Sequence, residues 1–183
     1  MILKISSRQT FTDISNLRCD LDLEHSNPIF PQNTPAYDAV LSVLQDKHEH
    51  STGFLIHKDI VNTVMGCCPV SSRLTTIHLR AVPFNITTVQ AYTPTSDYDD
   101  NKIEESYDQL QIVIDQTPKK DILVAQGDWN AKVGRDACGN WQGICGPFCN
   151  DDTNERGLRL LEFATFNNVV LANTFGHHKA SRR

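Results

Sequence analysis

The sequence predicts an α/β fold. Its later part alternates between short runs rich in β-branched or apolar residues, which indicate strands, and longer runs with apolar residues at helical spacing. From Phe84 onward the order is strand, helix, strand, helix, strand, which is typical of α/β proteins. Ligands of such sheets bind outside the carboxyl ends of the strands. The residues that follow each strand are therefore the first candidates for a functional site.

The composition indicates a soluble globular protein with one domain. The chain has 183 residues, of which 39% are hydrophobic and 21% charged, and no apolar run approaches the length of a membrane span. The N-terminal stretch MILKISSRQT turns polar too early for a secretory signal, so a nuclear or cytoplasmic location is expected. Without such a signal, the six cysteines are expected to be free thiols rather than disulfides or a metal site.

The net charge of −5 argues against one class of function. A protein that coats nucleic acid by charge alone is usually basic. An acidic enzyme can still meet phosphate groups through a bound cation, because the ion supplies the local positive charge.

The first fifty residues carry the weakest structural signal. Their periodicity is poor and three prolines interrupt it, so a loop or a poorly ordered segment is expected. The exception is residues 36–47, where Ala36, Val40 and Leu44 share one face at helical spacing and predict a helix.

Strand signals begin at Gly53. Residues 53–57 form a short apolar run, and a turn at Lys58 and Asp59 leads into a second run, IVNTVM. Two further strands are expected in sequence, in the segments LTTIHLR and FNITTVQAY.

Two helices are expected between the later strands. The first spans residues 101–117, with Asn101 as its N-cap, Glu104 at the third helical position and Pro118 beyond its end. Its apolar stripe consists of Ile103, Tyr107, Leu110 and Ile114. A buried strand, DILVAQ, follows it. Asp152 is then expected to cap the second helix, and VVLANT forms the last strand.

Polar side chains follow two of these strands. Asp128 and Asn130 come directly after DILVAQ in the stretch QGDWNAKVG, and Tyr92 ends FNITTVQAY. A carboxylate at a strand end can hold a metal or orient a water for attack on phosphorus, and a nearby amide can fix it. The phenol of Tyr92 can donate to developing phosphate charge. The alternative is structural, because Asp and Asn favour turns and half-buried tyrosines are common at strand ends.

The histidines offer no comparable arrangement. His57 and His78 lie in expected strands with no obvious partner, and His177 and His178 lie in a basic tail. We interpret the strand histidines as surface or locally satisfied residues. No P-loop, G-x-G-x-x-G, H-E-x-x-H or G-x-S-x-G motif occurs in the sequence.

Two motifs in order give a family resemblance. A strand ending in AYTPTSD, then a helix, then ILVAQGDWNAKVG resembles the endonuclease/exonuclease/phosphatase family, whose G-D-x-N-A signature is similar to GDWNA. The segments GFLIHKDIV, SSRLTTIHLR, NDDTNERGLRLLEFA and LANTFGHHKASRR resemble the endonuclease domain of non-LTR retrotransposons. The resemblance covers residues 53–183, about seven-tenths of the chain.

The resemblance implies a fold and a chemistry. The fold is a four-layer sandwich of two β-sheets flanked by helices, and the reaction is Mg²⁺-dependent hydrolysis of phosphodiesters, with DNA as the partner. It implies that Asp128 orients or deprotonates the attacking water, that Asn130 positions the aspartate and the phosphate, and that Tyr92 steadies a phosphate oxygen. Thr95 stands where some members carry Asn, which makes it a candidate for substrate binding.

The sequence also departs from the family pattern. Members carry an early strand with Asn, a metal-binding Glu at the end of the next strand, and a final Ser-Asp-His, and none of these is recognisable here. Residues 1–50 are therefore expected to be a divergent segment, and residues 51–183 a partial domain that is incomplete at both ends. The metal ligands are unknown, since Mg²⁺ needs oxygen ligands that the missing motifs would supply.

These departures leave competing functions. The first is a DNA endonuclease of retrotransposon origin, impaired by the missing motifs. The second is a catalytically inactive remnant or interaction module with the same partial fold. A phosphatase of small substrates is a third, because fold alone does not determine the substrate. The expectation is that the isolated chain has little or no nicking activity.

Overall fold

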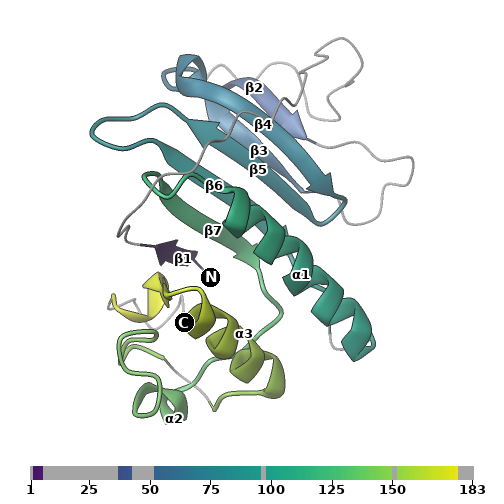
Figure 1. The fold of residues 1–183 in the computed structure, drawn as a ribbon, viewed down its shortest axis with the longest axis vertical. Coiled ribbons are helices and arrows are strands. Elements are labelled where there is room, and N and C mark those ends of the chain that lie inside the picture. Colours follow the sequence, from purple (N-terminus) through teal and green to yellow (C-terminus); the bar gives the residue numbers. More distant parts are fainter. Residues whose placement is uncertain (1, 6–36, 43–51, 96–97, 150–151, 177–183) are drawn as a thin grey trace.

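The computed structural model describes residues 2–5, 37–42, 52–95, 98–149 and 152–176. Within these ranges the strands form a six-stranded sheet, in the order β4-β5-β6-β7-β1-β8, and a two-stranded sheet of β2 and β3. Figure 1 shows both sheets and the helices. The strands are β1 (Ile2–Ile5), β2 (Tyr37–Ser42), β3 (Gly53–His57), β4 (Val64–Ser71), β5 (Leu74–Leu79), β6 (Ile86–Tyr92), β7 (Ile122–Asp128) and β8 (Val169–Leu171).

The helices lie between the later strands. They are α1 (Asp100–Gln116), the short α2 (Arg135–Cys138) and α3 (Glu155–Phe166), with 3-10 turns at Val61–Thr63 and Ala172–Thr174. No helix in the described residues is long and apolar enough to cross a membrane.

The large sheet is mixed in direction. Strands β4, β5 and β6 pair antiparallel as consecutive hairpins, and β6 pairs parallel with β7 after the crossover through α1. Strand β1 lies between β7 and β8 and runs antiparallel to both. The predicted α/β class is confirmed, although β7 and β8 are separated by a strand from the other end of the chain.

One face of the large sheet is covered by α1 and α3. Alternate residues of β6 point to these helices, which is why Thr87, Val89 and Ala91 are buried while their neighbours are only half-buried. The predicted helical stripe is largely confirmed, with Val113 rather than Ile114 as its last buried member. The main core contains residues of β5 to β8, both helices and the loop after β7.

The other face carries the small sheet. Phe54 and Ile56 of β3 pack with Cys67 and Ile77 of the large sheet in a second, smaller core. Within the described residues the layers are therefore helices, large sheet and small sheet. Two packed sheets with an outer helical layer agree with the predicted sandwich, and the second helical layer is not formed by the described residues.

Three local predictions are corrected. The helix expected over residues 36–47 is strand β2 in its described part, because pairing with β3 outweighs a helical spacing seen in only three apolar residues. The run IVNTVM is a 3-10 turn followed by β4, which continues through Pro69. That proline is tolerated because β4 is the edge strand of its sheet. Residues 2–5 form a strand that the sequence does not predict.

Both helices begin at other residues than expected. The side chain of Asp99 caps α1 by accepting a hydrogen bond from the Lys102 N–H at 3.0 Å, so Asn101 is already helical. The side chain of Asn154, not Asp152, caps α3. In each case several adjacent Asp and Asn residues are suitable N-caps. The residue that caps each helix, Asp99 or Asn154, is the one with extended backbone immediately before the first helical turn.

The cysteines differ partly from expectation. Cys67, Cys145 and Cys149 are free and buried, whereas Cys68 is disulfide-bonded. The expectation of free thiols is wrong for Cys68, because a disulfide depends on distances in the folded chain rather than on spacing in the sequence.

His78 has a partner that the sequence did not reveal. Its Nε2 lies 2.7 Å from Oδ2 of Asp121 without forming a hydrogen bond, and the Asp121 side chain is fully buried. The Thr87 hydroxyl donates to the same oxygen at 3.3 Å. This cluster joins the start of β6 and the residue before β7 to the end of β5, at the sheet end opposite Tyr92 and Asp128.

We expect His78→Ala to lower the free energy of unfolding by about 2 kcal/mol, because the buried Asp121 carboxylate would keep only the Thr87 hydroxyl as its partner among the contacts described above. Urea unfolding followed by circular dichroism measures the change. His57→Ala is the matched control, since His57 makes a similar contact to Asp59 on the surface, where an ion pair contributes less than about 1 kcal/mol. Equal losses in the two variants would contradict a structural role for the buried contact.

Candidate active site

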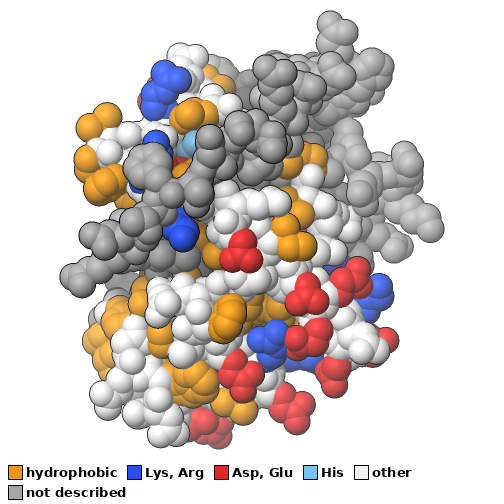
Figure 2. Space-filling view, in the orientation of Figure 1, with side chains coloured by type: hydrophobic (Ala, Val, Ile, Leu, Met, Phe, Trp, Pro, Cys, Tyr) orange, Lys and Arg blue, Asp and Glu red, His pale blue; other side chains and the backbone are white. Residues whose placement is uncertain are grey.

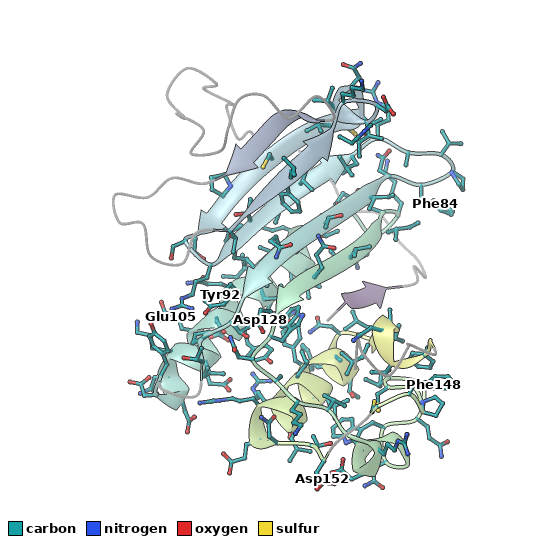
Figure 3. All side chains as sticks on the ribbon, turned by 180° about the vertical axis from the view of Figure 1, so that it is seen from behind. Phe84, Tyr92, Glu105, Asp128, Phe148 and Asp152 are labelled. Carbon is teal, nitrogen blue, oxygen red and sulfur yellow. The ribbon has the colours of Figure 1, made fainter. Side chains whose placement is uncertain are left out.

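The two strand ends that carry the predicted site residues are neighbours. Strands β6 and β7 are parallel, and Tyr92 and Asp128, the last residue of each, are paired in the register. Figure 3 shows their side chains together at one end of the sheet, with Phe84 at the other. The geometry expected of parallel strands therefore brings Tyr92 and Asp128 to the same end of the sheet.

Hydrogen bonds tie the segments that follow these strands to each other. The backbone N–H and the hydroxyl of Thr93 donate to the Asp128 carbonyl at 2.9 and 3.2 Å. The Asn130 side-chain amide donates to the Thr93 carbonyl at 2.7 Å. Asn130 therefore bridges the two strand ends through one of its two side-chain N–H groups.

The carboxylate of Asp128 is exposed and oriented from one side. Its Oδ1 accepts a hydrogen bond from the backbone N–H of Asn130 at 3.0 Å, in a turn where Asn130 has a left-handed φ of 46°. Asparagine is among the few residues that adopt this conformation readily. The turn interpretation and the active-site interpretation thus describe the same structure, because the turn holds one carboxylate oxygen and leaves Oδ2 available to a water.

A glycine allows β7 to approach β6 before Asp128. Gly127 has a φ of +141°, and a Cβ at that position would lie 1.8 Å from the Ala91 carbonyl oxygen. The next residue but one, Trp129, is buried in the main core. The backbone of Asp128 is therefore held on both sides, by the close approach of Gly127 to Ala91 before it and by the buried Trp129 side chain after it.

The loop beyond the site is fastened to the start of α3. Asn154 exchanges backbone and side-chain hydrogen bonds with Lys132, and its Oδ1 also accepts from the Gly157 N–H at 2.8 Å. The Thr153 hydroxyl donates to Asp136 at 2.6 Å, and this bond holds the pKa of the Asp136 carboxyl below its ordinary value. Sequence reasoning missed the role of Asn154, since these contacts span about twenty residues.

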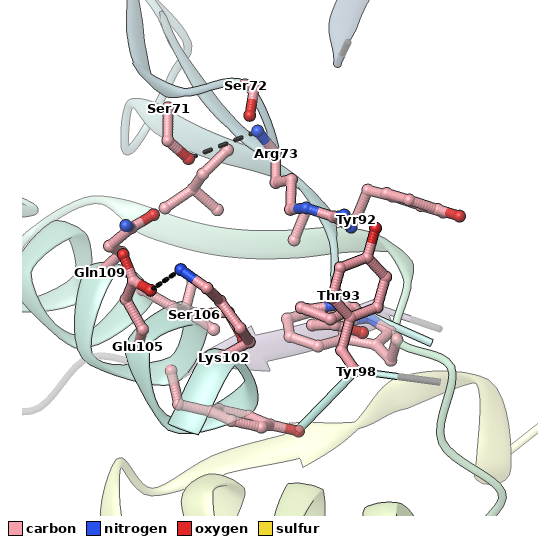
Figure 4. A pocket seen from close by; sticks show the side chains of 16 residues that line it. Ser71, Ser72, Arg73, Tyr92, Thr93, Tyr98, Lys102, Glu105, Ser106 and Gln109 are labelled. Atoms are coloured by element: carbon pink, nitrogen blue, oxygen red, sulfur yellow. Dashed lines mark hydrogen bonds and ion pairs between the residues drawn. The ribbon is translucent and has the colours of Figure 1, made fainter. Parts of the chain in front are cut away.

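A pocket of about 200 Å³ lies beside Tyr92, between the β4–β5 turn and α1. Figure 4 shows Arg73 and Tyr92 on one side and Lys102, which is paired with Glu105, on the other. Tyr107 also lines the pocket, and burial raises its pKa to about 12, so its phenol stays neutral. Asp128 and Asn130 lie outside the lining of this pocket.

Thr95 does not join the other predicted residues. It is half-buried, its carbonyl accepts a hydrogen bond from the Tyr98 N–H at 3.1 Å, and its side chain is not part of the pocket wall. Its position is that of a turn residue three places after Tyr92. A role in substrate binding stays a prediction.

Acidic side chains predominate on the outer surface of the two long helices, as Figure 2 shows. The exposed carboxylates there include Glu104, Glu105, Asp108, Glu155 and Glu162. A polyanion would be repelled from this face. The end of the sheet that carries Tyr92 and Asp128 also carries the basic residues Arg73 and Lys132.

The described residues do not by themselves form a complete Mg²⁺ site. They contain no group of three or more His, Cys, Asp or Glu residues that could hold a metal ion. Asp128 offers one carboxylate at the edge, whereas Mg²⁺ requires near-octahedral oxygen ligands. The single carboxylate fits one position of such a shell, and the remaining protein ligands stay unidentified.

Comparison with known proteins identifies relatives. No protein-family model matches the chain. Craniofacial development protein 2 of Bos taurus and that of Tragulus javanicus are each 34% identical to it over 139 residues. These residues make up 76% of this chain but 23% and 24% of the two relatives, so the chain spans about a quarter of their length.

One solved structure is also similar. The endonuclease domain of TRAS1, a telomere-specific non-LTR retrotransposon, matches 70% of this chain and 52% of that domain, with a TM-score of 0.46 and 18% identity. The α/β architecture and the sequence relatives support an endonuclease/exonuclease/phosphatase-like fold, as the motifs predicted. Among known proteins, the chain is similar to craniofacial development protein 2.

Proposed function

We propose that this chain is a DNA endonuclease of the phosphodiesterase type, with slow turnover. The single observation that carries the proposal is the pairing of Tyr92 and Asp128 at the ends of two parallel strands, with Asn130 fixing the loop between them. A carboxylate and a phenol at one edge suit the two demands of phosphodiester hydrolysis. One is an oriented water, and the other is a donor to the charged phosphate oxygens.

Each residue has a distinct role in this proposal. Oδ2 of Asp128 accepts a proton from the attacking water, while Oδ1 is held by Asn130. The Tyr92 phenol donates to a phosphate oxygen. Asn130 positions the aspartate through its backbone N–H and ties the two strand ends through one side-chain N–H, and its second side-chain N–H is the group that would contact the phosphate. A requirement for Mg²⁺, implied by the family resemblance, is part of the proposal, and its chemistry would be to neutralise phosphate charge.

A second candidate is an inactive interaction module. It is favoured because the described residues contain no group of three or more His, Cys, Asp or Glu residues that could hold a metal ion. The same observation leads us to expect slow turnover if the chain is an enzyme. Long incubation at high protein concentration is therefore part of the test.

The test is nicking of supercoiled plasmid with Mg²⁺ or with EDTA. We expect slow nicking with Mg²⁺ and at least a hundredfold loss in Asp128→Ala, since general-base groups contribute about 10² to 10⁴ in rate. Asp136→Ala is the matched control. Asp136 is also an exposed carboxylate, but its hydrogen bond is to Thr153 and not to Tyr92, Asp128 or Asn130. Wild-type nicking no faster than that of Asp128→Ala would contradict the proposal and favour the interaction module.

A further inference from the structure

We infer that Arg73 is a phosphate ligand of the substrate strand, in a subsite on the far side of Tyr92 from Asp128. The inference rests on the proposed action on DNA and adds a binding residue to it. Arg73 lies in the turn between β4 and β5, just before Leu74, and nothing in the local sequence SSRL distinguishes it.

The backbone places Arg73 at the same edge as the two site residues. Its carbonyl accepts a hydrogen bond from the Tyr92 N–H at 2.9 Å, and Tyr92 is the register partner of Asp128. The three residues thus follow one another across three adjacent chain segments. Adjacent strands lie about 4.8 Å apart, so Arg73 and Asp128 are separated by roughly two such spacings, about 10 Å. Arg73 therefore reaches a phosphate next to the one that faces Asp128.

The guanidinium lies between two tyrosine rings, and one of its donors has no partner among the described residues. Its central carbon lies 5.3 Å from the centre of the Tyr92 ring and 5.0 Å from that of Tyr98. No carboxylate or carbonyl of the described residues accepts from the Arg73 side chain, and its Nη1 is buried without a hydrogen-bond partner. Among the described residues, Lys102 is the other cation in the pocket wall, and it is already paired with Glu105 at 3.0 Å.

The buried Nη1 donor is what points to an anionic ligand. A buried donor without a partner is costly, and buried charges are normally paired. The two rings lie against the guanidinium, and the N–H groups of its Nη1 have no acceptor among the described residues. A planar guanidinium with free donors matches a phosphate group, which can accept two parallel hydrogen bonds from it.

The experiment measures binding rather than catalysis. Fluorescence anisotropy of a labelled DNA duplex is recorded in EDTA over a range of salt concentrations, with the whole 183-residue chain. Each phosphate contact steepens the plot of log affinity against log salt by about 0.9, so Arg73→Gln is expected to make it shallower by about that amount. The affinity at low salt should fall about tenfold, as for the loss of a charge-assisted hydrogen bond.

Two matched variants separate ligand contact from other effects. Arg80→Gln removes the same charge from an exposed arginine at the opposite end of β5, and its slope should equal that of the wild type. Arg73→Lys keeps the charge without the planar fork, so it should keep the slope while binding more weakly. The inference is overturned if Arg80→Gln and Arg73→Gln give the same slope, if Arg73→Lys loses as much slope as Arg73→Gln, or if the wild type does not bind the duplex.

The failure of this inference is distinguishable from that of the proposed function. A slope change specific to Arg73→Gln in a chain that does not nick plasmid would uphold the phosphate site and overturn the nuclease activity. Nicking that depends on Asp128, together with an unchanged slope in Arg73→Gln, would uphold the activity and overturn the Arg73 subsite.

Discussion

Gly127→Ala is expected to lower the free energy of unfolding by more than about 4 kcal/mol, or to prevent folding altogether. The added Cβ would lie 1.8 Å from the Ala91 carbonyl oxygen and 2.8 Å from its carbon. Both atoms belong to the backbone of β6, which cannot move without breaking its pairing with β5 and β7. The φ of +141° adds strain for any L side chain, of the order of 1–3 kcal/mol.

Urea unfolding followed by circular dichroism measures this effect, with recovery of soluble protein as a second readout. Gly66→Ala is the control, because no atom lies within 4 Å of a Cβ added to that strand residue. We expect it to unfold within about 1 kcal/mol of the wild type. Unfolding of both variants at similar urea concentrations would show that β7 does not approach β6 closely at Gly127. It would then also contradict the placement of Asp128 beside Tyr92.

Gly157→Ala is expected to have the second largest effect, a loss of about 3 kcal/mol, although helix propensity alone predicts a gain. Gly157 is the third residue of α3, where alanine is normally better than glycine by about 1 kcal/mol. The added Cβ would, however, lie 1.9 Å from the Lys132 carbonyl oxygen. That contact joins α3 to the loop after Asp128, so relief requires the loop and the helix to separate.

The control for this substitution is Gly139→Ala, which adds a methyl group to open space next to another helix end. Chemical denaturation compares the two variants, and limited proteolysis tests whether residues 132–154 become accessible. A Gly157→Ala protein that is as stable as the wild type, or more stable, would show that propensity dominates and that the loop is not held against α3.

The sequence determined the parts of the site that are local. Alternating β-branched residues predict the strand that ends at Tyr92, and the apolar run before Gly127 predicts the strand that ends at Asp128. The α/β order makes these two strands parallel neighbours, which is sufficient to bring the two side chains together. The Asx-type turn at Asn130 was also foreseeable, because Asp and Asn favour that geometry through bonds within two residues.

The candidate subsite was beyond sequence reasoning. Arg73 belongs to a turn with no motif, and its relation to Tyr92 arises from the antiparallel pairing of β5 with β6. The same applies to the contact between His78 and Asp121, whose residues are 43 positions apart but meet at one sheet end. Such contacts depend on register, which is a property of paired strands and not of either strand alone.

The sequence by itself determined the α/β class, the stripe of the first long helix and the two strand ends that carry Tyr92 and Asp128, since each depends on residues close together in the chain. Only the tertiary structure decided that residues 2–5 enter the sheet between β7 and β8 and that residues 37–42 are a strand rather than a helix. It also decided that the Arg73 guanidinium lies over the rings of Tyr92 and Tyr98. The physical reason is that strand pairing and side-chain contacts between residues far apart in the sequence stabilise the folded state. This stabilisation cannot be predicted from a short stretch of sequence, and it outweighs a weak local preference for helix.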